Sequence, residues 1–112
     1  MRKLALKDAF AVMRIIKAAG IRNEIIKFAS EIHDGKDVNE IGMEFVLTLI
    51  QAASDETVEL KLYQLYADLK GVDADEIGGY DFDTVKADVK TLIALNNLNS
   101  FFKSVSALMS KQ

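Results

Sequence analysis

The sequence predicts an all-α fold, a compact irregular bundle of six or seven short helices in a single domain over residues 1–112. The chain contains no proline, and most of its six glycines fall where helices would be expected to stop. No stretch keeps the period-two alternation and β-branched enrichment of a strand. The length suits one domain, which would bury about two-thirds of the surface of the unfolded chain.

The first two helices are expected at about Leu6–Ala19 and Ile21–His33. They end before Gly20 and Gly35, and a later helix ends before Gly71, because glycine readily adopts the left-handed conformation that closes many helices. Helical spacing gives the first helix an apolar face of Leu6, Phe10, Met13 and Ile16 and a basic face of Lys7, Arg14 and Lys17. The second helix is expected to bury Ile25, Phe28 and Ile32.

Asp37 and Glu40 have the spacing of a capping box and open a third helix that reaches about Ala53. Gly42 inside this helix costs about 1 kcal/mol relative to alanine, so we expect it to mark close packing of another backbone. Ser54 is expected to cap a fourth helix. The buried stripe of the fourth helix is Val58, Leu62, Leu65 and Leu69, with Tyr63 and Tyr66 on its flanks.

The acidic segment 73–84 contains part of a calcium-loop pattern. Ile77 and Thr84 stand at the fifth and twelfth positions, so two ligands would be missing. Asp73 and Glu76 fit better as caps of one short turn that ends at Gly78-Gly79. We therefore predict no calcium site in this segment.

Asp81 or Asp83 opens a sixth helix that stops near Asn96-Asn97. Ser100 is expected to cap a final short helix at Phe101–Met109. The sixth helix is expected to bury Val85, Val89, Leu92 and Leu95.

The residue inventory argues against an enzyme. The chain has no cysteine and one histidine, His33, so a zinc site and a thiolate nucleophile are not expected. No serine stands in a nucleophile elbow, and no glycine-rich loop has the pattern that cradles phosphate. We expect no catalytic, cofactor or metal site, and instead a protein that binds other proteins.

Charge is distributed unevenly along the chain. Residues 1–30 hold seven Lys/Arg and two Asp/Glu, whereas residues 31–88 hold four and fifteen. A basic surface of Lys3, Lys7, Arg14 and Lys17 is therefore a candidate docking site for an acidic partner or a neighbouring subunit. Alternatively, both charged regions are solvated and partly neutralise each other within one fold. The acidic segment would repel phosphate, which argues against nucleic-acid binding.

Hydrophobic residues make up 50% of the chain, and some of their surface could remain for a partner or a second copy. Phe101 and Phe102 are neighbours on one helix and point about 100° apart, so both are buried only if that helix is covered on two sides. We expect one of them to face a partner. The alternative is an ordinary leucine- and isoleucine-rich bundle.

Neither a leader nor a membrane span is expected. Residues 1–8 carry charges without an uninterrupted apolar region behind them, unlike a signal peptide. The most apolar stretch, residues 45–53, is far shorter than the roughly 20 residues that a spanning helix needs. The chain is expected to stay in the cytoplasm in which it is made.

From Val58 onward the residues resemble a known family. The run Leu62-Tyr63-Gln64-Leu65-Tyr66-Ala67-Asp68-Leu69-Lys70-Gly71-Val72 is followed by an acidic turn to Ile77, by Leu92-Ile93 and by the ending Asn99-Ser100-Phe101-Phe102-Lys103-Ser104. This pattern is similar to the tail assembly chaperones of siphophages and prophages of Gram-positive bacteria. It covers about half of the chain and includes no catalytic signature.

The resemblance implies a helical protein of the host cytoplasm that binds the tape measure protein. Such a chaperone keeps that long, aggregation-prone chain soluble while tail tube subunits assemble around it, and is generally absent from the finished virion. A longer product made by ribosomal frameshifting would recruit the major tail tube protein. The main alternative is a helical head–tail connector or another structural protein of a phage particle, and a transcriptional regulator comes third.

Overall fold

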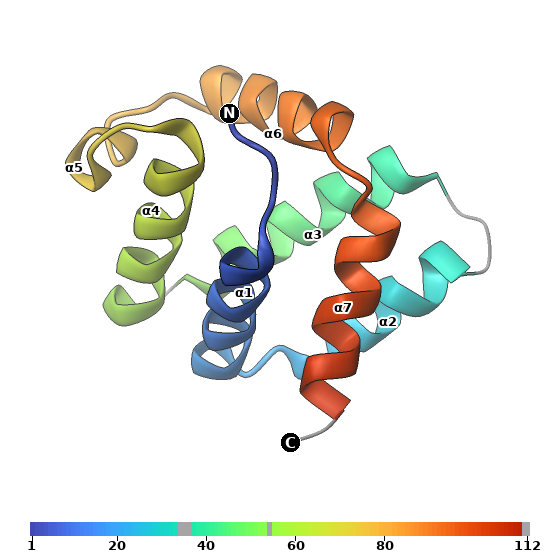
Figure 1. Ribbon diagram of the computed structural model, residues 1–112. Helices are drawn as coiled ribbons and strands as arrows, with labels where there is room; N and C mark the ends of the chain where they lie inside the picture. Colours follow the sequence, from blue (N-terminus) through green and yellow to red (C-terminus); the bar gives the residue numbers. More distant parts are fainter. Residues whose placement is uncertain (34–36, 54, 111–112) are drawn as a thin grey trace.

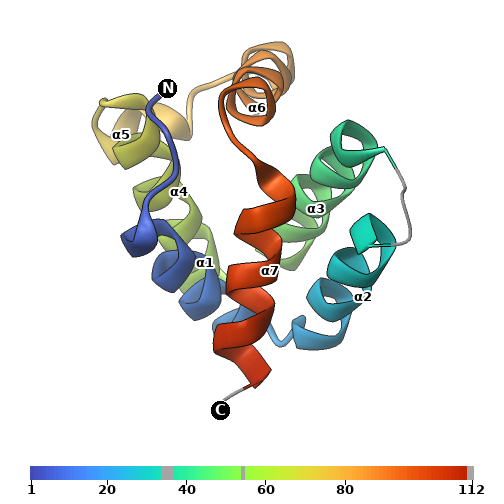
Figure 2. The ribbon, with the colours of Figure 1, turned by 45° about the vertical axis from the view of Figure 1, so that its right-hand side comes forward.

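The computed structural model describes residues 1–33, 37–53 and 55–110, which form seven α-helices and no strand. The helices are α1 (Leu6–Ala19), α2 (Arg22–His33), α3 (Val38–Ala52), α4 (Glu56–Lys70), α5 (Ala74–Ile77), α6 (Phe82–Leu95) and α7 (Leu98–Ser110). In Figures 1 and 2, α7 runs between α1 and α2 in front of α3, α6 lies above α3, and α4 and α5 lie on the left. The predicted all-α fold is confirmed.

Three aromatic rings join α2, α3 and α7 at the centre of the core. Phe45 of α3 has its ring centroid 6.0 Å from that of Phe28 in α2 and 4.9 Å from that of Phe102 in α7. Both pairs meet edge to face, an arrangement that adds about 1 kcal/mol to the burial of the rings. The remaining core side chains are Ala9, Val12, Ile15, Ile16, Ile25, Ile41, Leu49, Val58, Leu98, Val105 and Met109.

The buried face of α1 differs from the predicted one. Ile16 is buried as expected and Met13 is half-buried, but Leu6 is 69% exposed and Phe10 is 37% exposed. The helix is turned because it packs against both α4 and α7, and because the polar side chain of Asp8 is buried. The side chains that α1 buries are Asp8, Ala9, Val12, Ile15 and Ile16.

Aspartates begin two of the helices. Asp55 caps α4, because its side chain accepts a hydrogen bond of 2.7 Å from the Thr57 backbone N–H. The predicted cap, Ser54, lies outside the described residues. Asp81 caps α6 by accepting a hydrogen bond of 2.8 Å from Thr84 N–H, which decides between the two aspartates considered.

The last helix begins earlier than predicted. Asn97 precedes α7, and its side chain accepts a hydrogen bond of 3.2 Å from the Ser100 backbone N–H. The expected cap at Ser100 is therefore wrong, because the helix already begins at Leu98 and Asn97 accepts from one of the unpaired N–H groups of its first turn. The predicted short acidic turn is α5, in which Asp73 holds the cap position without a side-chain hydrogen bond.

Glycines end α1 and α4 as predicted. Gly20 has a φ of 71° and Gly71 a φ of 80°, both in the left-handed region. Gly35 lies outside the described residues. Gly42 has a different role, since a Cβ on it would lie 3.0 Å from Cδ1 of both Ile93 and Leu98. The expected close packing at Gly42 is thus present, although its neighbours are side chains and not another backbone.

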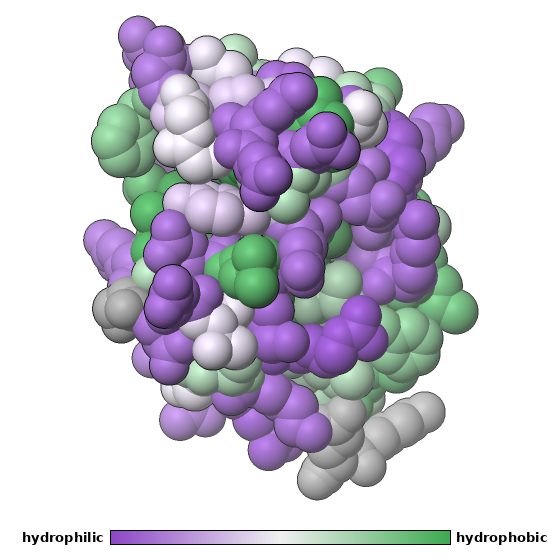
Figure 3. Space-filling view, turned by 90° about the vertical axis from the view of Figure 1, so that its left-hand side faces the viewer, coloured by the Kyte–Doolittle hydropathy of each residue, from purple (hydrophilic) through white to green (hydrophobic). Residues whose placement is uncertain are grey.

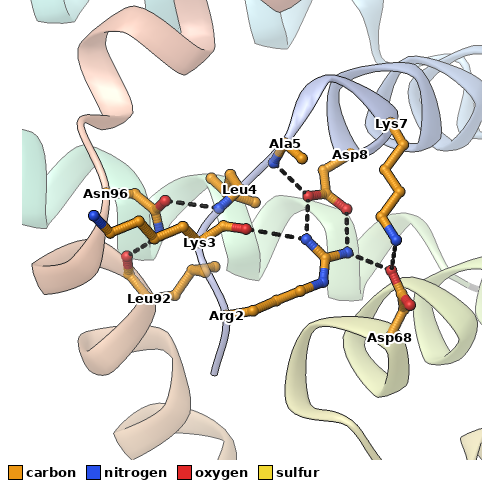
Figure 4. A network of polar contacts seen from close by, with 9 residues as sticks. All are labelled: Arg2, Lys3, Leu4, Ala5, Lys7, Asp8, Asp68, Leu92 and Asn96. Atoms are coloured by element: carbon orange, nitrogen blue, oxygen red, sulfur yellow. Dashed lines mark hydrogen bonds and ion pairs between the residues drawn. The ribbon is translucent and has the colours of Figure 1, made fainter.

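Residues 1–5 form a non-helical segment that is tied to α4 and to the end of α6. The backbone N–H of Arg2 donates a hydrogen bond of 2.9 Å to the carbonyl of Leu69. The N–H of Leu4 donates one of 2.8 Å to the Asn96 side chain, which in turn donates to the carbonyl of Leu92 (Figure 4). These contacts hold the segment across the gap between the two helices.

The same segment carries the counter-ion of a buried carboxylate. Arg2 donates two hydrogen bonds to Asp8, of 2.7 and 2.8 Å, and also binds Asp68 of α4 (Figure 4). Asp8 is 1% exposed and accepts a further hydrogen bond of 2.7 Å from the N–H of Ala5. The ammonium group of Lys7 lies 3.3 Å from Asp68. Two carboxylates and two cations therefore join the start of α1 to α4.

Both carboxylates of this network remain ionised at neutral pH. Burial acts to raise the pKa of Asp8, but the hydrogen bonds from Arg2 and Ala5 outweigh it and lower the pKa below its ordinary value. The pKa of Asp68 is lowered mainly by its bond to Arg2 and then by its bond to Lys7.

We predict that Gly42→Leu lowers the free energy of unfolding by about 1–3 kcal/mol, because the added side chain meets Ile93 and Leu98 in a packed contact. Gln51→Leu, an exposed position on the same helix, is the matched control. Urea denaturation followed by circular dichroism measures both. Equal stability of the two variants would show that the contact at Gly42 is loose.

We predict that Arg2→Met lowers the free energy of unfolding by about 3 kcal/mol at pH 7, because the buried Asp8 carboxylate loses its counter-ion. A carboxylate with a lowered folded pKa stabilises the fold above its unfolded pKa of about 3.9, and this contribution disappears as the pH falls through the folded pKa.

The wild type should therefore lose more stability between about pH 5 and about pH 3 than Arg2→Met does. Urea midpoints measured across this range test the difference. Lys3→Met, at an exposed neighbouring position, should keep the wild-type dependence. A variant Arg2→Met with an unchanged pH profile would contradict the assignment of the Asp8 pKa to Arg2.

Candidate functional site

An open groove of about 510 Å³ lies between α3, α4 and α6. Its lining is mostly apolar, and two of the side chains that line it are large, apolar and solvent-exposed: Ile50 by 40% and Phe82 by 80%. Met1 and Leu4 of the N-terminal segment also line it. Further apolar lining comes from Phe45 and Leu49 of α3, Leu62, Leu65 and Leu69 of α4, Val85, Val89 and Leu92 of α6, and Phe101 of α7.

The groove results from the way the helices pair. α6 packs on α3, whereas α4 packs mainly on α1 and α5, so the facing sides of α4 and α6 are not pressed together. Several side chains that were expected in the core are therefore only half-buried: Leu62, Leu65, Val85 and Leu92. Val89 is buried as predicted, and Leu95 is 40% exposed. Apolar surface that a closed bundle would cover remains open here.

A polar bridge connects α4 to α6 beside the groove. Asp88 of α6 accepts a hydrogen bond from the hydroxyl of Tyr66 and forms an ion pair of 2.8 Å with Lys70, both of α4. The ammonium group of Lys70 also lies 4.3 Å from the ring centroid of Tyr80. The rings of Tyr66 and Tyr80 meet edge to face with centroids 5.8 Å apart. The bridge holds the two helices at a fixed separation without closing the groove.

The protonation states of the bridge follow from its geometry. Burial, followed by the bond to Asp88, raises the pKa of Tyr66, so its hydroxyl remains a proton donor. Burial also acts to raise the pKa of Asp88, but the bonds from Lys70 and Tyr66 outweigh burial and lower it. At neutral pH the bridge therefore contains a carboxylate, an ammonium group and a neutral phenol.

The surroundings of the groove are acidic. Glu59 and Asp88 line it, and residues 73–88, which include α5 and the first half of α6, contain six Asp/Glu and one Lys. The exposed acids of this segment are Asp73, Asp75, Glu76, Asp81 and Asp83. Figure 3 views the side of the molecule on which α4 and α5 lie, and shows a largely hydrophilic surface with separate hydrophobic residues in it. A partner in the groove therefore meets apolar side chains surrounded by negative charge.

The basic residues proposed as a docking surface lie at different places. Lys7 and Arg14 line a smaller cavity of about 230 Å³ between α1 and α4, together with Asp8 and Asp68. Lys17 lies in the last turn of α1, and Lys3 lies in the N-terminal segment. The structure therefore brings Lys7 and Arg14 together and places Lys3 off the helix. The pairing of Lys7 with Asp68 neutralises part of the charge within the fold.

The two adjacent phenylalanines have different environments. Phe102 is 1% exposed and belongs to the core, whereas Phe101 is half-buried, and both line the groove. Their ring centroids lie 6.1 Å apart. α7 is covered on several sides, by α1, α2 and α3. Of the two rings, Phe101 is the one that a partner can reach.

Sequence reasoning missed Ile50 and Phe82, which are the most exposed large apolar side chains of the groove. Ile50 lies in the apolar stretch 45–53, which gives no sign that this side chain stays exposed. Phe82 did carry a signal, because it is the first residue of α6 and stands between two acidic residues, Asp81 and Asp83.

Within the described residues, no group of three or more His, Asp or Glu side chains is placed to hold a metal ion. His33 is the last residue of α2, as predicted. No helix in the described part of the chain is both long and apolar enough to cross a bilayer.

No family model, curated protein or solved structure matches this chain. Among the described residues, the open apolar groove is the feature that suits a binding partner.

Proposed function

We propose that this chain is a phage tail assembly chaperone that binds the tape measure protein and keeps it soluble during tail tube assembly. The observation that carries the proposal is the open apolar groove between α3, α4 and α6. Proteins that bind amphipathic helices use such a groove and need no chemistry. The resemblance of residues 62–104 to tail assembly chaperones supplies the identity of the partner.

The tape measure protein would be bound by its apolar side chains. A helix lying along the groove inserts anchors at positions i, i+3 or i+4, and i+7, and these would contact Ile50, Phe82 and Phe101. Because the groove is open on one side, it would cover only one face of a bound helix at each turn. Binding of many short segments suits a long partner that must later be released.

Charges would steer this association more than they fix its strength. The basic residues Lys3, Lys7, Arg14 and Lys17 would attract acidic segments of the tape measure protein, and the acids around the groove would attract basic ones. On this proposal the protein acts in the host cytoplasm without ATP or turnover and is left out of the finished virion. A frameshifted longer product would bring in the major tail tube protein.

Co-expression with the cognate tape measure protein tests the proposal. We expect the wild type to raise the soluble fraction of that protein and to be recovered with it in pull-downs. The variant Ile50→Ala/Phe82→Ala should weaken binding by about tenfold or more, since it removes two exposed apolar side chains of the groove. The matched control is Leu47→Ala/Leu60→Ala, which changes two exposed leucines that do not line the groove.

The chaperone function would be refuted if the tape measure protein were equally insoluble with and without this chain and pull-downs recovered no complex at low salt. That result would favour the head–tail connector. The position of the gene separates the same two functions independently. A gene beside a very long tape measure gene would favour the chaperone, and a gene beside portal and capsid genes would favour the connector.

A further inference from the structure

The outward face of α1 has the pattern of a groove-binding helix. Leu6, Phe10 and Met13 stand at positions i, i+4 and i+7, the spacing of anchors in helix-in-groove recognition. Leu6 is 69% exposed, Phe10 is 37% exposed and Met13 is half-buried. Leu6 and Phe10 thus present apolar surface to solvent, and Met13, at the end of this two-turn stripe, packs partly against the core.

Basic side chains accompany this stripe. Lys17 lies one helical turn beyond Met13 on the same face, and Arg14 lies at the edge of that face. Both are exposed, and no ion pair involves either of them within residues 1–33, 37–53 and 55–110. By contrast, Arg2 and Lys7 are compensated by Asp8 and Asp68. Part of the positive charge of residues 1–30 is therefore carried beside this stripe, and Lys3, Arg22 and Lys27 carry the rest elsewhere.

The groove has the complementary character. It is apolar inside, Glu59 lines it, and the neighbouring segment 73–88 is strongly acidic, although Asp88 of this segment is paired with Lys70. A helix is about 10–12 Å across, so it cannot enter a space of 510 Å³ and must lie along the mouth with its side chains inserted. An anionic amphiphile such as a fatty acid would suit the volume but would bring its carboxylate next to two others.

The two surfaces cannot meet within one molecule. α1 contacts α4 and α7 through its buried face, so the Leu6 and Phe10 side points away from its own groove. We infer that α1 of one copy docks by Leu6 and Phe10 on the acidic, apolar groove of a second copy. Such a contact joins two different surfaces head to tail and extends into a chain of subunits unless it closes into a ring. This self-association goes beyond the proposed chaperone function and does not require a tape measure protein.

Sedimentation velocity of the purified full chain tests the inference. We expect association that increases from about 10 µM to about 1 mM protein and is stronger at about 50 mM than at about 500 mM salt. The groove variant Ile50→Ala/Phe82→Ala and the α1 variant Leu6→Ala/Phe10→Ala should each weaken association by tenfold or more. All four positions are solvent-exposed, so the variants should fold.

A mixture of the two variants gives the most specific test of the inferred contact. The intact groove of the α1 variant can accept the intact α1 of the groove variant, so an equimolar mixture should form a one-to-one heterodimer that neither variant forms alone. Leu47→Ala/Leu60→Ala, which changes two other exposed leucines, should associate as the wild type does.

Several results would overturn the inference. The wild type could stay monomeric at the highest concentration. Association could be unchanged in either variant or by salt, or the mixture could contain no heterodimer. Because no tape measure protein is present, none of these results bears on the chaperone proposal, and failure of the co-expression test does not bear on self-association.

Discussion

The buried carboxylate of Asp8 needs a counter-ion, and Arg2 supplies it from the segment that precedes the helix. A carboxylate that is 1% exposed would otherwise carry a desolvation cost of several kcal/mol. The ion pair holds residues 1–5 against α4, so that Met1 and Leu4 line the groove. The interaction also sets the rotation of α1, because the face that contains Asp8 must turn inward. Leu6 and Phe10 then turn outward, so the α1 surface of the proposed self-association depends on this ion pair, which also places Met1 and Leu4 in the lining of the groove.

The groove exists because a second polar contact substitutes for apolar packing. Asp88, Lys70 and Tyr66 hold α4 and α6 together through short polar contacts, which are satisfied at a helix separation that leaves Leu62 and Leu92 half-buried. A tightly packed apolar contact would cover these side chains and remove the groove. A polar bridge of this kind therefore keeps binding surface open while it fixes the positions of the two helices.

Local signals predicted the elements well. The bounds of α1 agree with the prediction because a glycine in the left-handed conformation stops the helix, and Gly71 ends α4 in the same way. The predicted start of α7 was wrong because Asn97, of a residue type that caps helices as well as serine does, lies three residues before Ser100.

What could not be predicted depends on more than one helix at a time. Leu6 is as apolar as Ile15, so periodicity cannot show that an arginine outside the helix will turn Asp8 inward and Leu6 outward. The groove is likewise a property of the spacing between α4 and α6, which no single stripe encodes. Phe101 and Phe102 were the exception, because their 100° separation on one helix already implied different environments.

The charge asymmetry of the chain acquires a physical role once both surfaces are placed. If α1 of one copy covers the groove of the next, a partner helix must compete with α1 for the groove, and its apparent affinity falls as the concentration of the chain rises. Both occupants would use apolar anchors at helical spacing, so the charges on each helix decide which is preferred. α1 carries two basic residues, Arg14 and Lys17, beside its apolar stripe. A tape measure helix with more basic residues than this would displace the neighbouring copy, whereas an acidic helix would not. Self-association of this kind would shield Ile50 and Phe82 from indiscriminate apolar contacts until such a partner is made.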